Sequence, residues 1–179
     1  MSYKSFLNPI TASLLFALAI PALLICMLVI LLVDWQNPIF IQERFGFQKK
    51  KIRLIKLRTM KNNEVTRFGL LLRKTGLDEI PQLLNIIFGQ VNFVGPRPLT
   101  EFDVDRLNWA DDYHAMRWNI KPGLTGLAQL SLICNKKMSW FLDLKYLQCH
   151  NFWLDIKIIF ASCFVPILGK KRVINLIRK

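Results

Sequence analysis

The N-terminal part of the chain is one long apolar run. From Ile10 to Val33 there are 24 residues without a charged side chain. A straight helix of that length measures about 36 Å and could cross a hydrocarbon core of about 30 Å. Pro21 divides the run into two pieces of about 17 Å, each too short to cross alone. Lys4 is a weak charge signal for moving either end of the run across the membrane. We therefore favour a re-entrant helix-break-helix. A spanning helix stays the alternative, because it can also tolerate a proline.

Two alternating stretches follow the apolar run. Residues 37–47 and 49–60 read as extended segments joined near Gly46, which predicts a small β-hairpin. The alternation slips at Leu54-Ile55, which indicates either a bulge in the second strand or a separate purpose for Lys56 and Arg58, which fall on the face opposite to Lys51 and Arg53.

The remaining pattern is mainly helical. Amphipathic spacing predicts helices closed by Gly76 and Gly89, then a helix over 101–118, and residues 121–130 form a turn-rich loop. Residues 139–169 are apolar and aromatic and suit the membrane interface. The predicted fold class is therefore α+β and membrane-associated, with amphipathic interfacial helices around a compact catalytic domain. The expected domains are 1–34, embedded in the membrane, and 35–179, on its cytoplasmic face.

The stretch "TGLDEIPQLLN" places two carboxylates at a predicted helix start. Asp78 is a good N-cap, and Pro81 then falls in the first turn, where its missing N–H costs nothing. Thr75 is the alternative cap, but it would put Pro81 deeper in the helix. We prefer Asp78, which places Asp78 and Glu79 at the positive end of the helix dipole.

Composition and charge point to a membrane surface. Hydrophobic residues make up 53% of the chain, and 25 Lys and Arg against 12 Asp and Glu give a net charge of +13. Nucleic acid also attracts such a charge, but a nucleic-acid module has no need of the long apolar segment. Between Arg44 and Lys74 there is a single acid, Glu64, so this basic stretch suits anionic lipid.

Cysteine and histidine give no metal or triad signal. The cysteines are widely separated and form no CxxC pair: Cys26, Cys134, Cys149 and Cys163. They predict neither a zinc site nor a disulfide framework, and their mostly apolar surroundings predict buried, reduced thiols. His114 and His150 stand alone, which favours core or surface roles.

The remaining polar features fit phosphate chemistry. They are the carboxylate pair, the cations Lys56, Arg58 and Arg73, and Arg97 held between Pro96 and Pro98. The prolines restrict the backbone on both sides of Arg97, so its guanidinium can be aimed at low ordering cost, although a rigid turn with an incidental arginine explains the same residues. Phosphoryl transfer needs such cations, usually with Mg²⁺, and a carboxylate can act as its nucleophile. No glycine-rich phosphate loop is present in the sequence.

Five segments together resemble the bacterial sugar transferase family, the small monotopic phosphoglycosyl transferases. In chain order they are "FIQERFG", "IKLRTMK", "RFGLLLRKTGLDEIPQLLNIIFGQVNFVGPRP", "KPGLTGLAQ" and "LDLKYL" with "FWLDIKII". The resemblance covers nearly the whole chain. It implies transfer of a sugar phosphate from a UDP-sugar to polyprenyl (undecaprenyl) phosphate with release of UMP, the first membrane step of a bacterial surface glycan pathway.

The resemblance also implies roles for single residues. Asp78 would be the nucleophile and Glu79 its partner in Mg²⁺ binding or proton handling, with Lys56, Arg73 and Arg97 as the phosphate-binding cations. The positions that would support them are Arg58, Pro96, Pro98 and Asp143, and for Asp143 and Asp155 a structural role fits equally well. The family expects Ser-Pro at the break in its membrane helix, where this chain has Ile20-Pro21, so the hydroxyl that could rebond the freed carbonyls is missing.

Partners and location follow from the same resemblance. The expected partners are a UDP-sugar, polyprenyl phosphate and membrane lipids, with no nucleic acid, and the expected site is the cytoplasmic face of the bacterial inner membrane. The sequence does not select the sugar, the glycan pathway or the oligomeric state. The alternative is a noncatalytic membrane-anchored module that binds anionic lipid or nucleic acid through its basic strand, with steep salt dependence.

Overall fold

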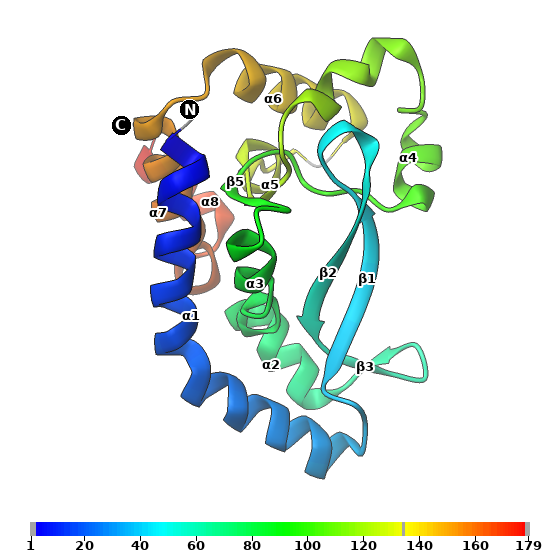
Figure 1. Cartoon of the computed structure of the whole chain (residues 1–179), viewed down its shortest axis with the longest axis vertical. Helices are drawn as coiled ribbons and strands as arrows, with labels where there is room; N and C mark the ends of the chain where they lie inside the picture. The colour runs from blue at the N-terminus through cyan, green and yellow to red at the C-terminus, as the bar shows by residue number, and fades with distance from the viewer. Residues whose placement is uncertain (1–2, 134, 178–179) are drawn as a thin grey trace. The chain divides into compact units, whose positions relative to one another are not determined.

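The computed structural model of the chain describes residues 3–133 and 135–177 (Figure 1). They form two compact units, Met1–Glu43 with Arg53–Gly89, and Arg44–Ile52 with Gln90–Lys179. Helices alternate with three small two-stranded sheets, which confirms the α+β class. The boundary expected between residues 34 and 35 stays a prediction.

The N-terminal apolar run folds as one helix. Helix α1 (Tyr3–Val29) continues through Pro21 into a π-helical turn, η1 (Ile30–Asp34). Its ribbon changes direction part-way along (Figure 1), as expected where a proline removes a hydrogen-bond donor inside a helix. Residues Leu7–Asp34 are long and apolar enough to cross a membrane. The re-entrant path itself stays a prediction.

One side of this helix packs within the first unit. Leu23, Cys26 and Ile30 are buried against Leu57 and Leu72. The rest of the helix exposes large apolar side chains, among them Leu14, Leu18, Leu24, Ile25, Leu28 and Leu32. Water does not stabilise such a surface, so it marks the part of α1 suited to lipid.

Two short sheets complete the first unit. Strands β1 (Ile39–Phe45) and β2 (Lys51–Leu57) pair as the predicted hairpin, whose tip belongs to the second unit. Strand β3 (Met60–Lys61) then pairs with β4 (Glu64–Val65) in antiparallel fashion. Along β2, Leu54 and Leu57 are both buried although they lie three residues apart. The strict alternation of inward and outward side chains is therefore interrupted after Leu54, where the sequence predicted it.

Helix α2 (Arg67–Thr75) ends at Gly76, as predicted. The Thr66 hydroxyl accepts the Gly69 N–H at 2.9 Å, and the chain leaves the helix at Gly76, whose φ is 76°. Glycine adopts this left-handed conformation without strain. The Thr75 hydroxyl donates to the Leu71 carbonyl at 2.9 Å, so Thr75 does not cap the next helix.

The prediction that Asp78 caps the next helix is wrong. After Gly76 the chain enters a 3₁₀ turn, η3 (Leu77–Glu79), and α3 (Gln82–Ile87) begins only after Pro81. The left-handed glycine lets one helix pass directly into a new turn, closed by the Glu79 N–H on the Gly76 carbonyl at 3.1 Å. Asp78 therefore lies inside a tight turn instead of at a helix N-terminus.

The second unit contains a parallel strand pair that the sequence pattern missed. Strand β5 (Asn92–Val94) pairs with β6 (Gly123–Thr125), within the stretch predicted as a loop, and a short helix, α5 (Leu127–Leu130), follows. A Cβ on Gly123 would lie 2.0 Å from the Gly95 nitrogen, so the two backbones meet where only glycine fits.

The single helix expected over 101–118 is also wrong. Helix α4 (Glu101–Leu107) stops at Asn108, whose φ is 49°, and a 3₁₀ segment, η4 (Asp112–Asn119), follows. Asparagine tolerates the left-handed conformation, and the break lets Trp109 enter the core with 1% of its surface exposed.

Three helices finish the chain: α6 (Lys136–Cys149), α7 (Phe152–Leu168) and α8 (Lys170–Ile177). The Tyr146 hydroxyl lies 2.7 Å from an Asp155 oxygen and 3.0 Å from the Val94 carbonyl, which ties α6 and α7 to β5. This contact gives Asp155 a structural role. The prediction of buried cysteines is confirmed for Cys26 and is wrong for Cys149 and Cys163. These two are exposed because they fall on outward faces of α6 and α7. Cys134 lies outside the described residues.

Candidate active site

The two carboxylates of η3 have different surroundings. The Lys56 Nζ donates to Glu79 Oε1 at 2.8 Å, and the two side chains are 19% and 41% exposed. Asp78 forms no ion pair with the residues that the structure describes. The predicted cation and carboxylate pair thus meet in the first unit, with Glu79 directly paired and Asp78 left open to another group.

A buried asparagine brings these residues together. The Asn85 amide donates to the Arg53 carbonyl at 2.7 Å and accepts the Ile55 N–H at 3.1 Å. It therefore binds the strand backbone on both sides of Leu54, where the alternation of β2 slips, and only 1% of it is exposed. Asn85 fixes α3, and with it the turn that carries Asp78, to the strand that carries Lys56.

Burial raises the pKa of the Asp78 carboxyl above its usual value. Desolvation is the largest cause, the neighbouring Glu79 charge adds to it, and Lys56, the residue's own backbone N–H and Arg73 oppose it. The sequence suggested a helix N-terminus that favours the ionised form, whereas in this turn the surroundings favour the neutral acid. A carboxylate that is poorly solvated when charged is a stronger nucleophile than one stabilised by water and fixed partners.

Two further basic residues predicted for the site, Arg73 and Arg58, differ in their contacts. Arg73 Nε donates to the buried Thr59 hydroxyl at 2.9 Å, which fixes the guanidinium while its charge still lowers the pKa of Asp78. Arg58 donates to the Asn37 carbonyl at 2.8 Å and to the Ile39 carbonyl at 3.3 Å. Arg58 therefore ties the end of β2 to the start of β1, a structural role.

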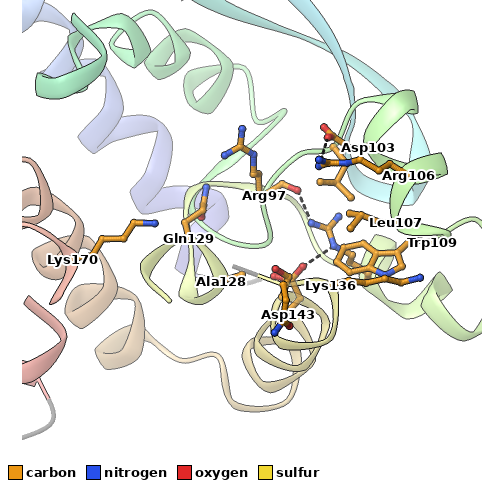
Figure 2. Close-up of a pocket in the computed structure, with 14 residues that line it drawn as sticks. Arg97, Asp103, Arg106, Leu107, Trp109, Ala128, Gln129, Lys136, Asp143 and Lys170 are labelled. Carbon is orange, nitrogen blue, oxygen red and sulfur yellow. Dashed lines mark hydrogen bonds and ion pairs between the residues drawn. The ribbon is translucent and has the colours of Figure 1, made fainter. Parts of the chain in front are cut away.

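In the second unit, Arg97 projects from a tight turn between two buried prolines. Pro96 and Pro98 are buried, whereas the Arg97 side chain is exposed and forms no hydrogen bond or ion pair with the described residues. Figure 2 shows its guanidinium turned away from its own carbonyl group. The arrangement agrees with the predicted rigid turn that presents an arginine.

Asp143 contacts this turn through an arginine that the sequence pattern did not single out. Arg117 Nε donates to Asp143 Oδ2 at 2.8 Å, and its Nη2 donates to the Arg97 carbonyl at 2.6 Å (Figure 2). Burial raises the pKa of the Asp143 carboxyl, and Arg117 opposes that rise. The buried aspartate thus supports the turn indirectly, as its structural alternative suggested.

A cavity of about 690 Å³ lies beside Arg97 within the second unit. Polar side chains line it, among them Gln129, Asn135, Lys136, Ser139 and Lys170. Figure 2 shows Gln129 and Lys170 on the same side of the turn as the Arg97 guanidinium. The volume of the cavity is typical of sites for small ligands.

The carboxylate pair also has the donor chemistry that Mg²⁺ requires. Among residues 3–133 and 135–177, no group of three or more His, Cys, Asp or Glu side chains could hold a metal ion. Mg²⁺ is often bound by one or two carboxylates together with substrate phosphates. Asp78 and Glu79 supply two adjacent carboxylates of the kind that this pattern uses.

Comparison with known proteins places the chain in a family. Residues 1–169 match the family described as bacterial sugar transferase. The chain belongs to the bacterial sugar transferase family. The motifs that suggested this family include the turn with Asp78 and Glu79, the end of β2 and the Arg97 turn.

Several relatives within the bacterial sugar transferase family carry named activities. A UDP-glucose:undecaprenyl-phosphate glucose-1-phosphate transferase of Klebsiella pneumoniae is 33% identical over 95% of this chain, which spans 41% of that protein. One of the same name from Caulobacter vibrioides is 34% identical over 89% of this chain, which spans 67% of it. A UDP-galactose-lipid carrier transferase of Erwinia amylovora is 33% identical over 85% of this chain and 39% of its own length.

Proposed function

We propose that the chain is a phosphoglycosyl transferase that moves a sugar phosphate from a UDP-sugar to polyprenyl phosphate and releases UMP. The observation that carries the proposal is the contrast between two adjacent carboxylates. Glu79 is paired with Lys56 at 2.8 Å, whereas Asp78 is half-buried, has a raised pKa and forms no ion pair with any described residue. One carboxylate is thereby held in place while the other stays available for a covalent bond. The family and the names of the relatives support the same reaction.

The proposed reaction has two displacements. In the first, an Asp78 carboxylate oxygen attacks the sugar-bearing phosphorus of the UDP-sugar. The bond from that phosphorus to the bridging oxygen breaks, and UMP leaves with the electron pair. In the second, a phosphate oxygen of polyprenyl phosphate attacks the same phosphorus, which frees the Asp78 carboxylate and gives polyprenyl diphosphate sugar. Each step exchanges one phosphorus–oxygen bond for another, so no oxidant or reductant is required.

Cations that bind the substrate would make attack of one anion on another feasible. We assign Lys56, Arg73 and Arg97 to the diphosphate oxygens, where they neutralise charge as the phosphorus is transferred. Lys56 also holds Glu79, and Arg73 is fixed by Thr59, so both are ordered before substrate arrives. Glu79 and Asp78 would hold Mg²⁺, which when bound supplies further charge neutralisation on the diphosphate.

The proposed location is the cytoplasmic face of the bacterial inner membrane. The stretch 44–74, rich in Lys and Arg, follows the apolar helix, and such basic segments stay on the cytoplasmic side. There the exposed apolar surface of α1 would lie in the lipid that also holds the polyprenyl acceptor. An enzyme with one water-soluble and one lipid substrate requires this position.

The reaction is tested by nucleotide release without acceptor. Purified protein with excess UDP-glucose and Mg²⁺ should release about one UMP per protein and then stop, because the covalent intermediate has no acceptor. Adding undecaprenyl phosphate should restart release, and EDTA should prevent it. Asp78→Asn should release none, whereas Asp105→Asn, a change at an exposed aspartate of α4, should behave like the unaltered protein.

A different result would overturn the proposal. If none of a panel of UDP-sugars yields UMP with or without acceptor, the chain is not a transferase of this kind. If release is continuous without acceptor and unaffected by Asp78→Asn, the covalent mechanism fails although the substrate assignment stands.

A further inference from the structure

The turn that carries Arg97 is held by its carbonyl groups. Four consecutive carbonyls, from Pro96 to Leu99, each accept a hydrogen bond from a different residue, and these donors come from three segments of the second unit. Their donors are Gly123 N–H to Pro96 at 2.9 Å, Arg117 Nη2 to Arg97 at 2.6 Å, Arg44 Nη1 to Pro98 at 2.9 Å, and Phe45 N–H to Leu99 at 2.8 Å. Because the two prolines have no N–H, carbonyls are the main groups through which the rest of the fold can hold this turn.

Two of these four donors are arginine side chains, and each is itself fixed by an aspartate. Arg117 and Asp143 are 3% and 5% exposed and meet at 2.8 Å. Arg44 and Asp103 are 10% and 21% exposed and meet at 3.4 Å. Arg117 uses two nitrogens of its planar guanidinium, Nε on Asp143 and Nη2 on the Arg97 carbonyl, whereas Arg44 contacts both Asp103 and the Pro98 carbonyl through Nη1.

The buried arginine also lies close to two tryptophan rings. The Arg117 guanidinium lies 5.3 Å from the ring centre of Trp109 and 5.2 Å from that of Trp118. Burying an ion pair costs free energy that well-packed apolar residues would not require, so the fold gains no obvious stability from this choice. What it gains is a rigid hydrogen-bond donor aimed at the Arg97 carbonyl.

The restrained backbone contrasts with the free side chain that it carries. The prolines fix φ before and after Arg97, and the bonded carbonyls fix the peptide planes between them, while the Arg97 guanidinium is exposed and unbonded among the described residues. A cation whose backbone is ordered in advance loses less entropy when it binds a phosphate.

We propose that Arg117, with Asp143, and Arg44, with Asp103, are positioning residues that orient Arg97 toward the diphosphate of the substrate. They act through the Arg97 and Pro98 carbonyls and do not touch the substrate. The inference rests on the proposed function in so far as it assigns Arg97 to the diphosphate. The restraint on the turn itself can be measured without any substrate.

A double-mutant cycle tests the positioning role. Arg117→Lys keeps the charge beside Asp143 but loses the fork, and we expect it to lower kcat/KM for the UDP-sugar by about 10- to 100-fold. In an Arg97→Ala background the same change should cost no more than about twofold, because its target is already gone. Arg44→Lys should show the same pattern. Equal losses in both backgrounds would mean a general structural role and overturn the inference.

A matched control and a second variant distinguish a loss of positioning from a loss of folded protein. Arg106 bonds the same Asp103 at 3.2 Å but is 64% exposed and donates to none of the four carbonyls in the described part of the chain, so Arg106→Gln should leave kcat/KM within about twofold. Arg117→Met combined with Asp143→Leu removes both buried charges. It should fold, since no charge is left unpaired, and still lose the activity that depends on Arg97.

Hydrogen exchange separates failure of this inference from failure of the proposed function. The Gly95 N–H donates to the Thr125 carbonyl, and the Gly123 N–H donates to the Pro96 carbonyl, both at 2.9 Å. In Arg117→Lys these two amides should exchange at least about tenfold faster, while amides of α6 and α7 should be unchanged. Unchanged exchange at both glycines would refute the restraint even if the enzyme is active, and faster exchange would support it even if UDP-sugar proves to be the wrong substrate.

Discussion

At the scale of single residues, the central feature is an uneven pair of neighbouring acids. Glu79 is held by Lys56 at 2.8 Å, and Asp78 lies half-buried beside it with its pKa raised first by desolvation and then by the Glu79 charge. Ionising Asp78 in the folded chain therefore costs more than ionising it in the unfolded chain. The side chain proposed as nucleophile should weaken the fold that holds it.

This cost gives a pH-dependent prediction for Asp78→Asn. The pKa of Asp78 is higher in the folded chain than in the unfolded chain, so the protonated form stabilises the fold. This stabilisation is complete below the unfolded pKa and is lost as the pH rises through the folded pKa. At pH 7 the neutral amide should therefore raise the melting temperature. The difference should shrink as the pH approaches 4, near the usual pKa of aspartate.

Thermal unfolding in detergent across this pH range checks the prediction, with Asp105→Asn as the control. A lower melting temperature for Asp78→Asn at pH 7, with no change toward acid pH, would show that the surroundings stabilise the charged form instead.

At the scale of elements, the sequence located most segments but not all of their ends. Gly76 was predictable because a left-handed glycine commonly ends a helix, and its φ of 76° confirms it. The cap at Asp78 was wrong because the same glycine allows an immediate 3₁₀ turn, which competes with a capped helix and leaves no sequence signal of its own.

Long-range contacts explain the other misses. Strand β6 has only three residues, and its pairing depends on Gly123 meeting Gly95, which lies far away in the sequence. Asn85 is the last residue of the stretch "TGLDEIPQLLN", but its two bonds to β2 cannot be inferred from spacing. Arg117 resembled any arginine of an amphipathic segment until the fold placed it against Asp143 and the Arg97 carbonyl.

Removing the side chain of Asn85 should affect both stability and activity. Asn85→Ala leaves the Arg53 carbonyl and the Ile55 N–H without this partner, at a cost of roughly 2 kcal/mol in the free energy of unfolding. It should also lower kcat, because η3 and β2 lose their fixed spacing. Denaturant unfolding and UMP release measure the two effects.

Lys74→Ala, a change at an exposed position on α2, is the control and should leave both nearly unchanged. Unaltered kcat in a destabilised Asn85→Ala would show that this asparagine stabilises the fold without positioning the carboxylates.

The path of α1 through the membrane gives a prediction about sidedness. A re-entrant helix keeps both of its ends on one face, and a spanning helix puts them on opposite faces. In a background without the natural cysteines, we expect Asn8→Cys and Glu64→Cys to be labelled from the same side of sealed vesicles by a membrane-impermeant maleimide. Labelling from opposite sides would establish the spanning path and contradict the re-entrant one.

At the scale of the whole molecule, apolar surface and positive charge could both hold the chain to a membrane. The net charge is +13, and the exposed large apolar side chains of α1 would form a second, salt-independent attachment. Electrostatic binding to anionic lipid weakens as salt screens it, whereas apolar burial does not. The two attachments therefore respond differently to the same treatment.

We expect membranes washed with 1 M NaCl to retain the protein and detergent to release it. Immunoblotting of pellet and supernatant is sufficient for the measurement. Quantitative release by salt would favour the noncatalytic module that binds lipid through its basic strand.

The central claim is that the Asp78 oxygen becomes bonded to phosphorus, and mass spectrometry tests it most directly. Protein incubated with UDP-glucose and no acceptor should gain the mass of one hexose phosphate, located by peptide mapping to the segment that contains Asp78. Undecaprenyl phosphate should then remove it, and hydroxylamine should cleave it as an acyl phosphate. Turnover with no adduct at any time, or an adduct that persists in Asp78→Asn, would contradict the account.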